Sequence, residues 1–125
     1  RRIGDAPNVQ FHVNEADTLP SGIAHASVDV AYIFTVFQHI PREYAASLLF
    51  QVRTLLTDSG VAVFNLISGA NETLNDGAVD TEWAIGYSRE QAAALVDQAG
   101  LQTRRIVRWS RPETPISWLW VLASH

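Results

Sequence analysis

The chain of 125 residues predicts a layered α/β fold, and three observations support this prediction. Residues 28–34 and 61–67 are short apolar runs of the kind found in strands that are buried on both faces. Between them, residues 42–56 repeat apolar side chains at helical spacing. After the second run, residues 89–99 predict another helix, and two more strand-like segments follow it. Strands that alternate with helices are typical of an α/β sheet.

The first two predicted strands precede the first helix. Residues 8–13 (NVQFHV) alternate apolar with polar side chains, which predicts a strand at the edge of the sheet with one wetter face. Residues 19–22 (LPSG) end that pattern. Residues 28–34 (VDVAYIF) are then nearly continuous in apolar character, so we expect a strand buried on both faces.

The first helix is predicted from its apolar face and from its ends. Pro41 suits the first turn, where its missing N–H group is not needed. Asp58, Ser59 and Gly60 predict the end of the helix, with the glycine in the left-handed conformation. Residues 61–67 (VAVFNLI) then predict another buried strand. The apolar face of the helix contains Ala45, Leu48, Leu49, Val52, Leu55 and Leu56.

The segment 68–87 interrupts the regular pattern. It has three glycines, two asparagines and two isolated aromatic residues. A loop of this length in a compact domain is typical of a lid, a binding loop or an insertion. Trp83 and Tyr87 either face a ligand or anchor the loop to the core, and the sequence leaves both interpretations open.

The last third of the chain predicts a helix and a hairpin. Ser88 followed by Gln91 is the spacing of a capping box, and Gly100 is placed to end the helix that begins there. Its predicted buried face contains Ala92, Leu95, Val96 and Ala99. Residues 102–109 and 116–123 are strand-like, and the connection between them is too short for a crossover, so we expect an antiparallel pair.

Composition excludes several kinds of protein. The net charge of −4 gives no electrostatic reason to expect binding to nucleic acid or to an anionic membrane. With no cysteine there is no disulfide or thiolate metal site, which favours a cytoplasmic protein. No apolar run approaches the about 20 residues that span a bilayer. The basic cluster of Arg104, Arg105, Arg108 and Arg111 is interpreted as a solvated face.

The beginning of the sequence predicts that a longer protein was trimmed. The chain opens on Arg1 and Arg2 and contains no methionine. No glycine-rich phosphate or nucleoside loop precedes the first strands, although α/β nucleotide-binding folds have one there. We therefore expect residues 1–125 to be the C-terminal portion of a single domain.

The order of several short motifs resembles the class I S-adenosylmethionine-dependent methyltransferases. That family typically has a G-D-A-x-x-L-P turn, an F-D-V-V strand, a V-L-H-H-L segment, a V-L-K-P-G-G turn, a late Y-S helix start and an A-G-F helix end. No single motif is specific, but the ordered set covers nearly the whole chain. The matching segments are 14–20 (NEADTLP), 28–30 (VDV), 36–41 (VFQHIP), 55–60 (LLTDSG), 87–88 (YS) and 99–101 (AGL).

The resemblance implies a partial Rossmann-like methyltransferase sheet, mostly parallel with a C-terminal antiparallel hairpin. The family's strand order is 3-2-1-4-5-7-6, and this chain resembles strands three to seven. The implied activity is methyl transfer from S-adenosyl-L-methionine to a small molecule by the full-length protein. Because the glycine-rich loop is absent, we expect the isolated chain to bind the cofactor poorly. An uncovered edge of the sheet would also favour a homo-oligomer.

The resemblance also assigns roles to five residues. Glu15 and Ala16 correspond to the turn that contacts adenine, although Glu15 is equally interpretable as a solvated carboxylate. Ile33 and Phe34 correspond to contacts with the methionine arm, with a place in the core as the alternative. His39 is the candidate catalytic base, and the alternative is a histidine that packs and fixes its loop. No metal site is predicted.

Two other functions remain open at this stage. A fragment of a nicotinamide-dependent oxidoreductase would share the rhythm of strand, helix and strand, but the terminal hairpin and the Leu-Pro turn argue against it. A noncatalytic methyltransferase-like module that serves as an oligomerisation surface would keep the fold without the chemistry. Comparing the binding of S-adenosylmethionine with the binding of NAD distinguishes a methyltransferase from the oxidoreductase. A pocket filled by the protein's own side chains would indicate the noncatalytic module.

Overall fold

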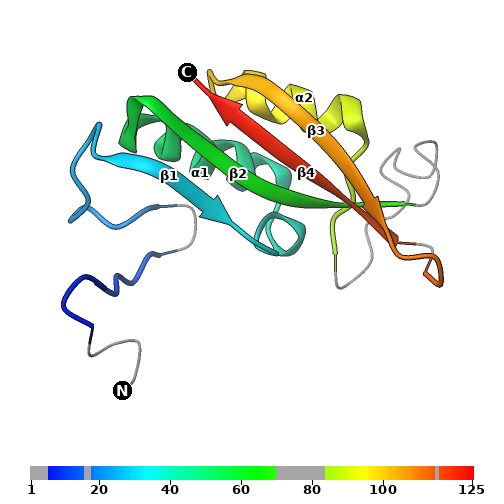
Figure 1. Ribbon diagram of the computed structural model, residues 1–125, viewed down its shortest axis with the longest axis horizontal. Helices are drawn as coiled ribbons and strands as arrows, with labels where there is room; N and C mark the ends of the chain where they lie inside the picture. The colour runs from blue at the N-terminus through cyan, green and yellow to red at the C-terminus, as the bar shows by residue number, and fades with distance from the viewer. Residues whose placement is uncertain (1–5, 16–17, 70–83, 115) are drawn as a thin grey trace.

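The computed structural model describes residues 6–15, 18–69, 84–114 and 116–125, and the strands among them form one sheet with helices on one side (Figure 1). The sheet has the order β1-β2-β4-β3. β1 and β2 are parallel, whereas β4 is antiparallel to both β2 and β3. This arrangement confirms the α/β fold class and the C-terminal hairpin. The strands are β1 (Val28–Ile33), β2 (Leu56–Gly69), β3 (Gln102–Ser110) and β4 (Ile116–Ser124).

Two α-helices cover one face of this sheet. Figure 1 shows α1 (Arg42–Leu55) and α2 (Arg89–Gln98) lying behind the strands, and none of the described helices lies in front of them. A short 3-10 helix, η2 (Phe37–His39), links β1 to α1. The core lies between the helices and the sheet, so the opposite face of the strands has no described helical layer.

Alternation along β4 shows how the two faces differ. Leu119 and Val121 are buried toward the helices, while Trp118 and Trp120, which alternate with them, are only half-buried on the other face. Successive side chains of a strand point to opposite faces, so the pattern follows from strand geometry. The face without helices, called here the open face, therefore carries large apolar side chains.

The expectation that residues 28–34 are buried on both faces was wrong. In β1, Ala31 and Ile33 pack against the core, but Val30 and Tyr32 are 60% and 62% exposed. Their side chains lie on the open face, which no described helix covers. β1 is also the last strand of the described sheet on its side. The apolar character of the strand therefore reflects one face in the core and one face on the surface.

The predicted strand at 8–13 is absent. These residues form no ladder with any described strand, and Phe11 and Val13 are 75% and 90% exposed. The alternating pattern was the only signal for a strand, and an extended segment without a neighbour has no ladder of hydrogen bonds to stabilise it. The backbone instead makes a local bond from Val9 N–H to the carbonyl of Ala6.

The predicted start and end of α2 are confirmed. Ser88 N–H donates to Gln91 Oε1 at 2.9 Å, and Gln91 N–H donates to Ser88 Oγ at 3.1 Å, which is a complete capping box. Gly100 has φ of 72°, and the N–H of Leu101 donates to the carbonyl of Val96. This is the Schellman end expected from a glycine at that position.

Gly60 does not end α1 in a left-handed turn. The helix ends at Leu55, and Leu56 is already extended with φ of −65° and ψ of 139°. Gly60 lies instead in an irregular part of the β1–β2 pairing, where Val28 pairs with Leu56 and Val30 pairs with Val61. A Cβ atom on Gly60 would be 2.7 Å from the carbonyl oxygen of Val28. The glycine is required by this close backbone approach.

We predict that Gly60→Ala lowers the free energy of unfolding by about 1–3 kcal/mol, the usual cost of overpacking. The reason is that the atoms this Cβ would meet belong to the backbone of Val28 and Thr57, which cannot move aside without shifting the strands. Gly22→Ala is the control, because its Cβ would meet only the His12 side chain at 3.4 Å. Urea unfolding of both variants measures the difference, and equal midpoints would contradict the prediction.

Candidate functional site

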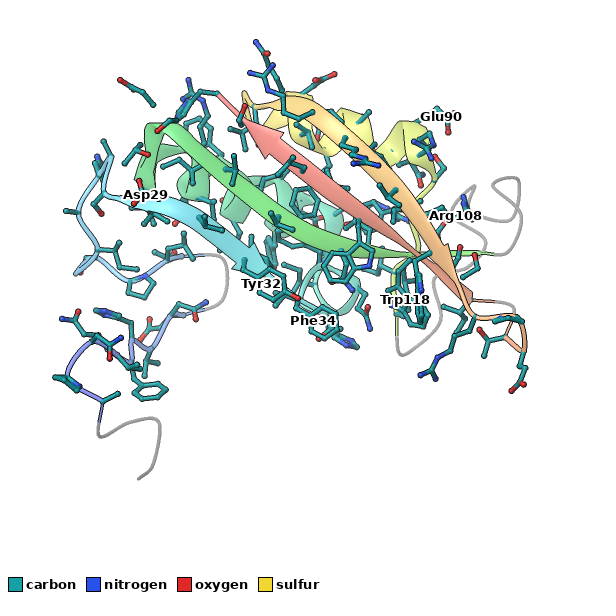
Figure 2. All side chains as sticks on the ribbon, viewed as in Figure 1. Asp29, Tyr32, Phe34, Glu90, Arg108 and Trp118 are labelled. Atoms are coloured by element: carbon teal, nitrogen blue, oxygen red, sulfur yellow. The ribbon has the colours of Figure 1, made fainter. Side chains whose placement is uncertain are left out.

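A pocket of about 480 Å³ opens on the open face, at the carboxyl ends of β1 and β3. Figure 2 shows Phe34 just beyond the end of β1 and Trp118 near the beginning of β4. Ligands of open α/β sheets bind outside the carboxyl ends of the strands, so this is the expected place for a site. The lining residues are Phe34, Thr35, Asn65, Trp109, Arg111, Trp118 and Trp120.

Flat aromatic rings form most of the pocket wall. The rings of Phe34 and Trp120 are 5.7 Å apart with an interplanar angle of 13°, and Tyr32 stacks beside them. The rings of Trp109 and Trp118 are 5.4 Å apart and tilted by 44°. Phe34 and Trp109 are each about half exposed, at 51% and 49%. Such rings offer faces on which a planar apolar group can stack.

Asn65 is the buried polar residue of the pocket. It lies on β2 and is 1% exposed. Its Oδ1 accepts a hydrogen bond of 2.7 Å from the N–H of Thr35. Its Nδ2 has no hydrogen-bond partner among the described residues. A buried donor left unpaired costs about 1–3 kcal/mol, so this amide is a ready donor to a group that enters the pocket.

Thr35 has a strained backbone at the mouth of the pocket. Its φ is 56°, in the left-handed region that a β-branched residue rarely occupies. That conformation costs roughly 1–2 kcal/mol. The hydrogen bond to Asn65 fixes the direction of its N–H group. The turn after β1 is thus held in a disfavoured shape by a residue of the neighbouring strand.

Arg111 carries the only charge among the described lining residues. Its Cζ lies 6.0 Å from the centre of the Trp109 ring, which is within reach of a cation–π contact. Two other arginines of the predicted basic face donate hydrogen bonds to serines of β4 instead. Arg104 donates to Ser124 Oγ, and Arg108 donates to Ser117 Oγ. Sequence reasoning grouped all four and missed the one at the pocket.

The five predicted site residues are distributed over different places. Phe34 lines the pocket, whereas Ile33 beside it packs on the core side of the sheet. His39 is exposed on η2, with its Nε2 3.1 Å from Gln38 Nε2. Glu15 is exposed, and its carbonyl accepts from Thr18 N–H. Ala16 lies outside the described residues. Of the predicted site residues that the structure describes, Phe34 is the one that lines the pocket.

Tyr87 is a core residue. It is 1% exposed, its N–H donates to the carbonyl of Ile67, and Arg42 Cζ lies 5.2 Å from its ring centre. Of the two interpretations, the anchor therefore holds for Tyr87, while Trp83 lies outside the described residues. Within the described ranges, no three histidine or acidic side chains gather as metal ligands, and no helix has the length and apolar character to cross a membrane.

Comparison with known proteins identifies the fold. No protein-family model and no curated sequence matches the chain. Solved structures do match it. Burkholderia thailandensis 1,6-didemethyltoxoflavin-N1-methyltransferase, with bound 1,6-didemethyltoxoflavin and S-adenosylhomocysteine, has a TM-score of 0.71 at 17% identity over 91% of this chain. A SAM-dependent methyltransferase from Methanosarcina mazei has a TM-score of 0.68 at 14% identity, also over 91%. An enzyme of a pericyclic reaction has a TM-score of 0.62 at 11% identity over 90%.

The chain has the fold of the class I S-adenosylmethionine-dependent methyltransferases. The strand order β1-β2-β4-β3 agrees with strands 4-5-7-6 of the order that the resemblance implied. The chain spans 49%, 66% and 29% of the lengths of the three matched chains. It therefore corresponds to part of each of them, and the pocket lies at the carboxyl edge of that part of the methyltransferase fold.

We predict that Thr35→Gly leaves the free energy of unfolding unchanged or raises it by up to about 1 kcal/mol. Relief of the left-handed strain offsets the entropic cost of a new glycine, which is about 0.5–1 kcal/mol. The neighbouring Val36 has φ of −96°, so Val36→Gly gains no relief and is expected to be destabilising. Thermal unfolding compares the two variants. A larger loss for Thr35→Gly than for Val36→Gly would contradict the strain.

Proposed function

We propose that this chain is the C-terminal part of a methyltransferase that transfers a methyl group from S-adenosyl-L-methionine to a small molecule. In this proposal the pocket holds the methyl acceptor. The observation that carries it is the position of a ligand-sized pocket at the carboxyl edge of a methyltransferase fold. Its volume falls in the ordinary range of small-molecule sites, about 300–1,000 Å³. The Burkholderia neighbour supports it, since that protein binds a small acceptor together with S-adenosylhomocysteine.

The lining of the pocket fits an acceptor better than the cofactor. S-adenosylmethionine presents ribose hydroxyls, one carboxylate and two positive groups, the ammonium and the sulfonium, so its net charge is positive. No carboxylate is among the described lining residues, and the single charge there is the cation of Arg111. Like charges close together are unfavourable in a partly desolvated site. We therefore place the cofactor beside the pocket, with Glu15, Ala16, Ile33 and Phe34 as its proposed contacts and Phe34 at the boundary.

The chain's own contribution to catalysis would be positioning. When bound, the cofactor supplies an activated methyl group, so the protein has little covalent work to do. Holding two reactants in line accounts for about 7–11 kcal/mol of barrier lowering in favourable cases. The aromatic walls exclude water and fix the plane of the acceptor, and the Thr35–Asn65 contact fixes the edge of the pocket.

We predict that the chain alone binds S-adenosylmethionine weakly and binds it well when expressed with the sequence encoded upstream of it. Nothing among the described residues forms a glycine-rich loop for the nucleoside, and Glu15 is exposed. Isothermal titration of both proteins measures the difference. Micromolar binding by the chain alone would contradict the prediction.

The same preparations distinguish the alternative functions. Binding of NAD in place of S-adenosylmethionine would indicate the oxidoreductase. Binding of S-adenosylmethionine without transfer of a labelled methyl group to any acceptor would favour a noncatalytic module or another reaction. A reaction other than methyl transfer is compatible with this fold, because the enzyme of a pericyclic reaction among the structural neighbours has a similar fold.

His39 is the proposed base for an acceptor that must lose a proton. It is exposed on η2, directly after the turn that contains Thr35. In this role, His39→Gln is expected to lower kcat by roughly 100-fold or more, with little change in the KM of the acceptor. His25→Gln is the control, since His25 is exposed and lies outside η2. An unchanged kcat would show that the acceptor needs no base from His39.

We also propose that the free edge of β1 supports association. β1 pairs with β2 on one side, and none of the described strands pairs with its other side. An apolar edge strand is a template for pairing with another chain. Sedimentation of the chain alone is expected to show self-association, and a monomer at all concentrations would argue against this partner.

A further inference from the structure

We propose that the pocket is built for a planar heteroaromatic molecule that presents a hydrogen-bond acceptor to Asn65. Its edge toward Arg111 carries an acidic N–H or O–H group, which becomes an anion when it loses its proton. The identification of that molecule as the methyl acceptor rests on the proposed function. The binding preference itself does not. It follows from three independent features of the lining, which are flat aromatic walls, one buried donor and one cation.

The aromatic walls select the shape of the ligand. Phe34 and Trp120 present nearly parallel planes, and Trp109 and Trp118 stand opposite each other across the β3–β4 pair. Stacked or offset ring contacts add about 0.5–1.5 kcal/mol per pair beyond simple burial. A flexible aliphatic molecule would fill the same volume without these contacts. The walls therefore favour a rigid ring system.

Asn65 selects the chemistry of one edge of the ring. Its Oδ1 is already engaged by Thr35 N–H, so the side chain offers its Nδ2 as a donor. A purely apolar ring would leave this donor unpaired and desolvated. A ring nitrogen or carbonyl would pair with it. Sites that hydrogen-bond one edge of a ligand reject analogues lacking the matching atom.

Arg111 selects the charge. An acceptor with an acidic N–H or O–H becomes a better nucleophile when it loses its proton, and a guanidinium stabilises the resulting anion. In the transfer, the new N–C or O–C bond forms as the S–C bond of the cofactor breaks. S-adenosylhomocysteine leaves, and the proton of the acceptor passes to water or to His39. Atoms and charge balance without an oxidant or reductant.

A segment of protein lying over the open face is the competing occupant. Such a segment would bury the aromatic rings, and its apolar contacts would need neither the donor of Asn65 nor the cation of Arg111. The unpaired buried amide is what favours a small polar-edged ligand over a packing element. The experiment therefore includes the longer protein as well as the chain alone.

Lumazine and naphthalene are the matched probes. Both are flat two-ring molecules, but lumazine has ring carbonyls, ring nitrogens and an acidic N–H, whereas naphthalene has none. Three of the four tryptophans of the chain line the pocket, so quenching of tryptophan fluorescence reports occupancy. We expect saturable quenching by lumazine, in the chain alone and in the longer protein, with naphthalene weaker.

Three variants test the polar contacts. Asn65→Asp keeps an oxygen for Thr35 N–H but removes the donor, and Asn65→Leu removes the donor without adding charge. Each is expected to weaken lumazine roughly tenfold or more and to leave naphthalene within about twofold. Arg111→Gln is expected to weaken lumazine severalfold. Near-ultraviolet circular dichroism verifies folding, and Asn65→Asp carries the test if Asn65→Leu does not fold.

Three results would overturn the proposal. These are no saturable lumazine binding to folded protein, equal loss of both probes in the Asn65 variants, and lumazine binding to the chain alone that disappears in the longer protein. The last would show that a protein segment occupies the pocket. Lumazine binding requires no cofactor, so failure of methyl transfer with intact lumazine binding would refute the proposed function and leave the pocket's preference standing.

Discussion

The register between β2 and β4 determines both faces of this molecule. Nine consecutive pairs run from Val61 opposite Ser124 to Gly69 opposite Ile116 without a bulge. In this register Asn65 lies opposite Trp120 on the open face, while Phe64 beside it is fully buried under the helices. A slip of one residue would exchange the two faces. Burial of a Phe or Leu side chain contributes about 1.5–3 kcal/mol, so the core on one face fixes the pocket on the other.

Local signals in the sequence predicted the elements that local interactions stabilise. The capping box at Ser88 and the glycine at 100 act within one turn of α2, and both are present in the structure. The incorrect predictions concern features that depend on residues far away in the sequence. The pattern at 8–13 needs a neighbouring strand, and the exposure of β1 needs knowledge of which face the helices cover. Gly60 looked like a helix end because its contact with Val28 is made across the sheet.

The pocket was less predictable than the fold for the same reason. Phe34 was predicted because its motif lies at the end of a strand. Asn65 and Arg111 line the same pocket because the pairing of the strands brings distant segments of the sequence together. Two signals were present. Asn65 is the single polar residue in the run 61–67, and Trp118 and Trp120 alternate with smaller or buried neighbours along β4. The positive φ of Thr35 had no signal in the sequence, since neither glycine nor asparagine stands there.

Two requirements conflict on the open face: its exposed apolar side chains favour a covering element, whereas the pocket must stay accessible to a ligand. Val30, Tyr32 and Val107 on it are at least 41% exposed, and apolar surface of this kind usually marks an interaction site. An element that covers the whole face would also close the pocket at the carboxyl end of β1. Two polar groups of the face reduce this conflict, because Asn65 and Arg111 both line the pocket, whereas Arg105 lies away from it near Val63 and Val107. A covering element gains most over the exposed Val30 and Val107, whose side chains have no polar group, and gains least over the buried donor of Asn65. The chemistry of the face thus separates an area suited to packing from an area suited to a ligand.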